Sequence, residues 1–235
     1  MRKTESFSIT AEPGAIEFVP DTTALIIIDM QKDFLEHGGF GEALGNDISL
    51  LRDCVRPCQQ LLLAARECGL TIIHTREGHR SDLTDLHAEK LRRAEPGKAI
   101  GDPGPMGRIL IRGEQGNDFI NELKPLPGEA IVDKPGKGAF YCTDLAILLG
   151  RAQIQTLIIC GVTTEVCVHT TVREANDRGY RVIVPGDCCA SYFPEFHRVG
   201  LKMISAQGGI FGSVCESENI INALRRKYSS NNNTC

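Results

Sequence analysis

The chain has 235 residues, of which 42% are hydrophobic, and a formal net charge of −4. This length and composition fit one domain with a full core, and the lack of a long basic run argues against nucleic acid as a partner. No apolar stretch reaches the roughly 18 residues that span a bilayer, and the first residues lack the apolar segment of a signal peptide. We therefore expect a cytoplasmic protein that binds neither nucleic acid nor membrane.

Ten cysteines are many for such a chain. Disulfide frameworks occur mainly in short secreted chains that lack a core, so we expect mostly free thiols. A thiol redox protein is an alternative. The sequence has no C-x-x-C pair, and the adjacent Cys188 and Cys189 are a poor substitute.

Short apolar runs rich in β-branched residues alternate with segments of helical spacing, and they predict five strands. The runs are Thr23–Asp29, Leu70–Thr75, Glu129–Lys134, Thr156–Gly161 and Arg181–Gly186. The predicted helices are 48–68, interrupted near Pro57, and 117–123, 143–150, 165–178, 195–205 and 218–228. Continuous apolar strands alternating with helices indicate an α/β fold with a doubly wound, open parallel sheet and helices on both faces.

We expect one domain over residues 23–228, preceded by an extension (1–22) and followed by a disordered tail (229–235). The long polar insertion Glu77–Gln115 contains the sequence GDPGPMG. Long ordered loops are usually functional, so we expect this insertion to border the site.

Three chemically distinct residues follow predicted strands, namely Asp29, Lys134 and Cys167. Ligands bind beyond the carboxyl ends of strands in open α/β sheets, so these side chains could meet at one edge. A helix start, with Thr163 or Thr164 as its cap, and a nearby ammonium would favour the Cys167 thiolate. Asp29 could then move protons as general base and acid.

Backbone N–H groups at Thr163 and Cys167 could bind the oxyanion that such an attack creates. Each residue also has a structural alternative. Cys167 could be a packed thiol, Asp29 a helix cap and Lys134 a solvated lysine. The presence of all three types at one predicted edge favours the catalytic interpretation.

Four motifs resemble those of the isochorismatase-like cysteine hydrolase family: ALIIIDMQKDF, VDKPGKGAF, CGVTTEVCVHTTVREANDRGY and AQGGIFGSV. The resemblance extends from about Thr23 to Leu224. It implies a parallel sheet of about six strands and a catalytic triad of Asp29, Lys134 and Cys167. It also implies a cis peptide bond between Val162 and Thr163, which would direct the Thr163 amide to the oxyanion, and a homo-oligomer, either a dimer or a tetramer.

Within the family, the segments IIHTREGHRSDLTDL and GDPGPMGRIL are similar to enzymes that hydrolyse biuret and triuret. This likeness implies that Lys137 and Gln207 bind the substrate's carbonyl oxygens and that Phe34 packs on the substrate. Taken alone, these residues fit a solvated loop lysine, a residue at a helix C-terminus and a core aromatic.

Some members of the family carry a metal site with an Asp-x-His pair near the second strand. Here Arg76 and Glu77 stand in its place, so His74, His79 and Asp82 are not expected to be ligands, and no metal or other cofactor is expected. We predict a metal-independent cysteine amidohydrolase that cleaves a C–N bond of a small carbamoyl-urea such as biuret, releasing ammonia. Triuret, ureidoacrylate or another carbamoyl amide are alternative substrates, and a catalytically silent small-molecule binder is the alternative class.

Overall fold

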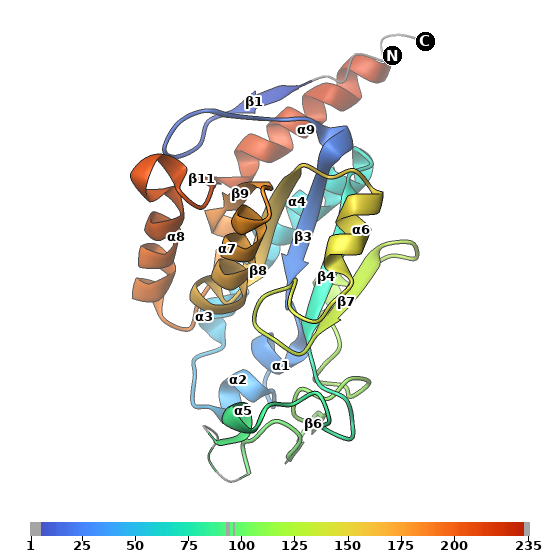
Figure 1. The fold of residues 1–235 in the computed structure, drawn as a ribbon, viewed down its shortest axis with the longest axis vertical. Helices are drawn as coiled ribbons and strands as arrows, with labels where there is room; N and C mark the ends of the chain where they lie inside the picture. The colour runs from blue at the N-terminus through green and yellow to red at the C-terminus, as the bar shows by residue number, and fades with distance from the viewer. Residues whose placement is uncertain (1–5, 93–94, 96, 233–235) are drawn as a thin grey trace.

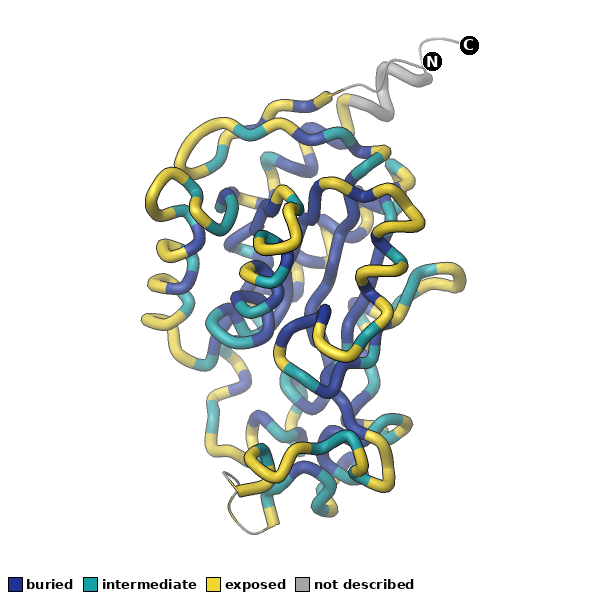
Figure 2. Tube along the Cα trace, viewed as in Figure 1, coloured by how far each residue is buried: buried dark blue, intermediate teal, exposed yellow. Residues whose placement is uncertain are grey.

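The computed structural model describes residues 6–92, 95 and 97–232, and its centre is a mostly buried parallel sheet (Figures 1 and 2). The sheet has the strand order β11-β9-β8-β3-β4-β7, and the short β10 also pairs with β8. All its pairings are parallel. These strands are β3 (Thr23–Ile28), β4 (Thr71–Glu77), β7 (Ala130–Lys134), β8 (Thr156–Val162), β9 (Arg181–Pro185), β10 (Cys189–Ala190) and β11 (Ser213–Cys215). The predicted fold class and the five predicted strands are confirmed.

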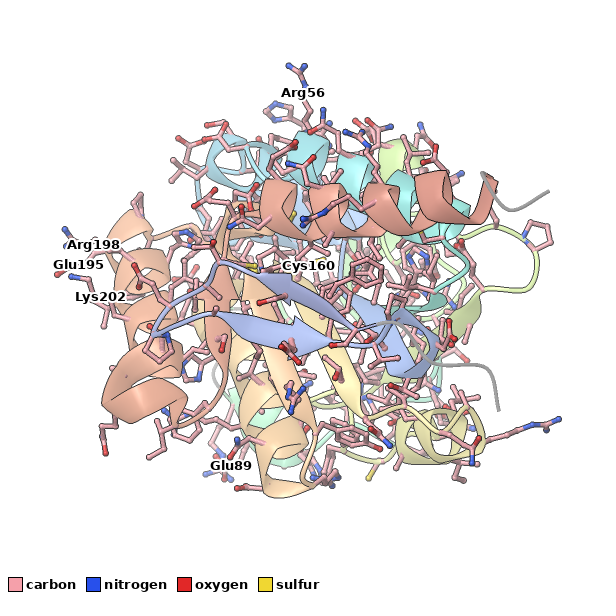
Figure 3. The ribbon with its side chains drawn as sticks, turned by 90° about the horizontal axis from the view of Figure 1, so that it is seen from above. Arg56, Glu89, Cys160, Glu195, Arg198 and Lys202 are labelled. Atoms are coloured by element: carbon pink, nitrogen blue, oxygen red, sulfur yellow. The ribbon has the colours of Figure 1, made fainter. Side chains whose placement is uncertain are left out.

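Helices cover both faces of the sheet, as the alternating sequence pattern predicts. In Figure 1, α6 (Leu145–Arg151) and α7 (His169–Asp177) lie in front of it, and α4 (Val55–Glu67) and α9 (Ser217–Asn232) lie behind. The view from above in Figure 3 separates these layers, with the labelled Cys160 between them. α8 (Pro194–Gly209) flanks the β9–β11 side of the sheet. Among the described residues, no helix combines the length and the hydropathy needed to cross a membrane.

Smaller elements complete the fold at its two ends. The first residues form a hairpin of β1 (Phe7–Ile9) and β2 (Ile16–Phe18), and Phe7, Ile9 and Phe18 are buried in the main core. The described part of the expected extension, residues 6–22, therefore contributes to the core. The other elements are α1 (Lys32–Leu35), α2 (Phe40–Ala43), α3 (Ser49–Arg52), α5 (Ala88–Arg92), β5 (Pro103–Gly104), β6 (Gly107–Arg108), and the single turns η1 (Pro20–Thr22), η2 (Asn121–Leu123), η3 (Thr164–Val168) and η4 (Gly186–Cys188).

Three predicted helices differ most from the structure. The expected helix 48–68 is split between α3 and α4, just before Pro57. The expected helix 117–123 is wrong, because only the short 3₁₀ turn η2 forms there; Ile120 instead donates its N–H to Met30, and Lys32 donates its N–H to Asp118. α9 continues to Asn232, beyond the helix end expected at Tyr228, and residues 233–235 of the expected tail lie outside the described residues.

Candidate active site

Asp29 stands one residue beyond β3 and is fully buried. Its backbone adopts a left-handed conformation with φ of 50°, which is uncommon for a residue other than glycine. Thr75 of β4 donates a hydrogen bond to Asp29 Oδ1 at 2.6 Å. Lys134 Nζ lies 2.7 Å from the other carboxylate oxygen. The carboxylate is therefore fixed between two neighbouring strands.

Lys134 is the last residue of β7, and its side chain has no exposed surface. Its ammonium also donates to the carbonyl oxygens of Gly136 and Lys137, at 3.1 and 3.0 Å. Burial acts to lower the pKa of Lys134, but the nearby Asp29, Cys167 and Glu77 outweigh it and hold the pKa above its usual value. This buried lysine is charged and is not the solvated residue of the structural alternative.

Cys167 lies in η3, a single turn of π-helix that leads from β8 into α7. The peptide bond between Val162 and Thr163 is cis. β8 passes close to β3 at Gly161, where φ is +113° and a side chain would meet Ile28 O at 2.1 Å, so only glycine fits. Neither predicted threonine caps the turn through its hydroxyl. Thr163 makes no side-chain capping bond, and Thr164 Oγ1 is 2.7 Å from His197 Nδ1.

The Cys167 thiol is protonated in the free protein, contrary to the expected thiolate. Burial and the neighbouring carboxylates of Asp29 and Glu77 raise its pKa well above the usual value, although Lys134 and Lys137 act to lower it. The thiol donates a hydrogen bond to Glu77 Oε2, with sulfur and oxygen 3.6 Å apart. One ligating atom each of Asp29, Glu77 and Cys167 lies within 4.8 Å of the others. Cys167 is therefore flanked by two carboxylates.

Glu77 is a site residue that the sequence analysis missed. It ends β4 and is paired in register with Lys134 of β7, and only 1% of its surface is exposed. Glu77 Oε1 accepts hydrogen bonds from Lys137 at 2.7 Å and from Lys90 at 2.9 Å. Burial alone would raise the pKa of Glu77, but Lys134, Lys137 and Lys90 together lower it to about 2. Glu77 is therefore ionised at neutral pH.

Lys90 is the second missed residue, and it comes from α5 in the long insertion. Besides Glu77, its ammonium contacts Pro135 O at 2.6 Å and His79 Nε2 at 3.1 Å. His79 Nε2 must then be the unprotonated nitrogen, while Nδ1 donates to Asp85 at 3.2 Å. The expectation that the insertion borders the site is confirmed through this lysine.

The three residues expected to bind substrate have different positions. Lys137 reaches the site through Glu77, and 44% of its side chain is exposed. Phe34 of α1 packs on Phe40 and on the apolar cluster around Ile109 in the insertion. Gln207 is not brought to the site of its own chain. It is exposed at the end of α8 away from His197, in a stretch of non-helical backbone from Ala206 to Gly208, whereas His197 contacts Thr164 next to the site. Its position fits the helix-terminus alternative.

The residues around the candidate nucleophile do not suit a metal ion. Asp29, Glu77 and Cys167 could supply ligand atoms, but ammonium groups already contact both carboxylates. A bound cation would face repulsion from three lysines. His74 pairs with Glu129, and Asp82 is exposed and pairs with Arg80. None of these contacts favours a metal centre.

Comparison with known proteins assigns the chain to a family. Residues 23–218 match the isochorismatase domain. The chain belongs to the isochorismatase family. It is a hydrolase of this family by sequence and by fold.

Several relatives support this membership over nearly the whole chain. The ureidoacrylate amidohydrolase RutB of Serratia proteamaculans is 30% identical over 229 residues, covering 95% of this chain and 91% of the relative. RutB of Cronobacter sakazakii is 29% identical and covers 93% of this chain and 95% of its own. A cysteine hydrolase from Pseudomonas syringae pv. phaseolicola is 31% identical, with a TM-score of 0.76 over 90% of this chain and 96% of that one.

Proposed function

We propose that this protein is a cysteine amidohydrolase that cleaves a C–N bond of a small N-carbamoyl compound, H₂N–CO–NH–R. One observation carries the proposal: the buried Cys167 thiol lies beside the ion pair of Asp29 and Lys134, at the carboxyl edge of the sheet. Ionisable groups that are buried together beside a thiol are typical of a catalytic site, and a silent binder would not need them.

In the acylation step, Asp29 takes the proton of the Cys167 thiol as the sulfur attacks the carbonyl carbon. A C–S bond forms, and the carbonyl electron pair moves to oxygen, where the N–H groups of Thr163 and Cys167 stabilise it. The C–N bond then breaks, and Asp29 returns the proton to the leaving nitrogen. Lys134 keeps its charge throughout and holds Asp29 in position.

In the second step, water attacks the thioester and Asp29 accepts one of its protons. The C–S bond breaks, and this proton returns to the sulfur, restoring the thiol. With biuret, the first step releases ammonia and the second releases carboxylated urea. With ureidoacrylate, cleavage on the other side of the carbonyl releases the amine and then carbamate.

Two substrates represent the class. Ureidoacrylate is supported by the relatives, which are named as ureidoacrylate amidohydrolases and cover most of this chain. The charges around Cys167 also suit a carboxylate, since Lys90, Lys134 and Lys137 outnumber Asp29 and Glu77 while the thiol is neutral. Biuret is supported by the motif likeness and by Lys137, an ammonium that can donate to a carbonyl oxygen. Triuret is a third candidate.

The test is turnover of biuret, triuret and ureidoacrylate by the purified protein, with ammonia and the amine product measured separately. Turnover of at least one ureide that is lost in Cys167→Ala supports the proposal. No turnover of any of them, with thermal stabilisation by the same compounds, would favour the silent binder.

Two further expectations accompany the proposal. Exhaustive chelation is expected to leave activity unchanged, and activity that disappears on chelation and returns with zinc would contradict a metal-independent mechanism. A homo-oligomer, either a dimer or a tetramer, stays a prediction. Gln207 lies at the end of α8 away from His197, and a second copy could present it to an active site.

A further inference from the structure

Glu77 occupies a position that the proposed mechanism does not use. Its carboxylate is ionised, almost fully buried, and in contact with the nucleophile. The two oxygens have different surroundings. Oε1 accepts from two ammonium groups, those of Lys137 and Lys90. Oε2 accepts from the weak S–H donor of Cys167, with oxygen and sulfur 3.6 Å apart.

This contact opposes ionisation of the thiol. A negative carboxylate beside sulfur raises the cost of forming a second negative charge there. The groups that face Cys167 come from four segments: Asp29 after β3, Glu77 at the end of β4, Lys134 at the end of β7, and Lys137 in the loop that follows it. Lys90 of α5 faces Glu77 from the insertion. In the free protein, this set leaves the thiol protonated.

Loss of the thiol proton would also leave Glu77 Oε2 without its donor. A buried, charged acceptor that loses its hydrogen bond is costly, so a replacement donor is needed when the sulfur attacks. An N-carbamoyl substrate carries N–H groups directly beside the carbonyl carbon under attack. Such an N–H is a stronger donor to a carboxylate than the thiol it would replace.

We propose that Glu77 Oε2 accepts a hydrogen bond from an N–H group of the substrate, and that this exchange releases the Cys167 S–H to be deprotonated by Asp29. Glu77 thereby makes the nucleophile reactive only when a ureido compound is bound. The inference rests on the proposed function and deepens it: Glu77 determines specificity for substrates with N–H beside the carbonyl. Esters, which lack this donor, would not trigger the exchange.

The test compares wild type, Glu77→Gln, Glu77→Asp and a control, Glu122→Gln. Glu122 pairs with Arg52 and contacts none of the residues around Cys167. Alkylation of Cys167 by iodoacetamide without substrate is followed against pH by peptide mass spectrometry. Turnover of biuret, ureidoacrylate and the N–H-free ester p-nitrophenyl acetate is measured in parallel.

Glu77→Gln is expected to alkylate about tenfold faster or more at neutral pH, because the opposing charge is gone. The same variant is expected to lose on the order of 10- to 100-fold in kcat/KM for ureides while keeping or gaining ester turnover. Glu77→Asp keeps the charge but shortens the reach, so its thiol stays slow to alkylate while ureide turnover falls. Glu122→Gln matches wild type in every assay.

Unchanged or slower alkylation in Glu77→Gln would overturn the coupling between Glu77 and Cys167. Equal losses for ureides and the ester would overturn the specificity role. If wild type hydrolyses no ureide but the alkylation rates shift as expected, the proposed function fails. The role of Glu77 in substrate specificity then fails too, while the coupling between Glu77 and Cys167 stands. If ureide turnover is normal and alkylation does not shift, only the inference fails.

Discussion

Cys167 and a group of cysteines buried elsewhere in the molecule have opposite surroundings. Cys167 has 5% of its surface exposed and faces two carboxylates and two lysines. That group, which we call the core thiol cluster, consists of Cys54, Cys58, Cys160, Cys188 and Cys189. Cys58 donates to Cys188 O at 3.0 Å, and only 1% of its surface is exposed. Cys167 and the core thiol cluster are therefore buried to a similar extent, and they differ in the charged side chains that Cys167 faces.

This difference distinguishes Cys167, the thiol that we propose to be reactive, from the packed thiols. Neighbouring thiols and burial raise the pKa of Cys58, and burial raises that of Cys189, with no ammonium to oppose them. Cys167 is protonated too, but Asp29 can take its proton and Lys134 can balance the charge. The nine cysteines in the described part of the chain are all free thiols. The core thiol cluster therefore behaves as packing, which weakens the redox alternative.

The largest expected effect separates the two groups by activity. Cys167→Ser should lose on the order of 10⁴-fold or more in ureide kcat/KM, because the nucleophile is gone, with no change in Tm. Cys58→Ala is the matched control and should keep wild-type kinetics. Loss of turnover in Cys58→Ala, or full turnover in Cys167→Ser, would contradict a special role of Cys167 among the buried cysteines.

The next effect concerns the charges that distinguish Cys167. Lys134→Met leaves Asp29 buried without its ion-pair partner and should lower the free energy of unfolding by about 3–5 kcal/mol in urea titrations. Adding Asp29→Asn removes the unpaired charge and should restore much of that stability, but not activity. Lys124→Met, at a half-exposed lysine 3.6 Å from Asp118, should cost less than about 1 kcal/mol. Equal costs for both lysines would contradict a buried, coupled site.

Glu77 should make the free energy of unfolding depend on pH below neutrality, and the core thiol cluster should not. Glu77 has a pKa of about 2 in the folded protein, against 4.5 ordinarily. Its contribution is therefore complete above pH 4.5 and is lost as the pH falls toward 2, by about 3 kcal/mol in total. Unfolding free energies between pH 7 and pH 3 should fall less steeply for Glu77→Gln than for wild type or Cys58→Ala. Parallel curves would contradict the ionised Glu77.

The smallest effect is the cost of the packed thiols themselves. Cys58→Ala should lower the free energy of unfolding by about 1 kcal/mol, which is the loss of one buried group of this size. Urea titration at pH 7 measures it. A loss that rises or falls steeply between pH 5 and pH 8 would mean that Cys58 ionises near neutrality, which its surroundings oppose.

Much of the fold follows from local signals. Continuous β-branched runs predict buried parallel strands, and the rule that ligands bind at their carboxyl ends brings Asp29, Lys134 and Cys167 together. The predicted helix 117–123 does not form because its backbone makes hydrogen bonds to another segment. Ile120 and Asp118 bond to the residues that follow β3. Tertiary hydrogen bonds override local propensity there.

The parts of the site that sequence could not supply depend on register and on the insertion. Glu77 lies two residues beyond the predicted strand end at Thr75, and only the pairing with β7 sets it opposite Lys134. A predicted strand that extended to Glu77 would have placed Glu77 at the site, because side chains alternate along a strand and Thr75 and Glu77 lie on one face. Lys90 lies within a polar insertion without periodicity, so its approach to Glu77 has no local signature.

The most direct test of the central claim is to trap the covalent intermediate. Wild-type protein is mixed with a ureide that it turns over, quenched with acid during steady state, and digested for peptide mass spectrometry. We expect an acyl group on Cys167 and on none of the cysteines of the core thiol cluster. Steady turnover with Cys167 unmodified, or an acyl group on another side chain, would contradict the assignment of Cys167 as the nucleophile.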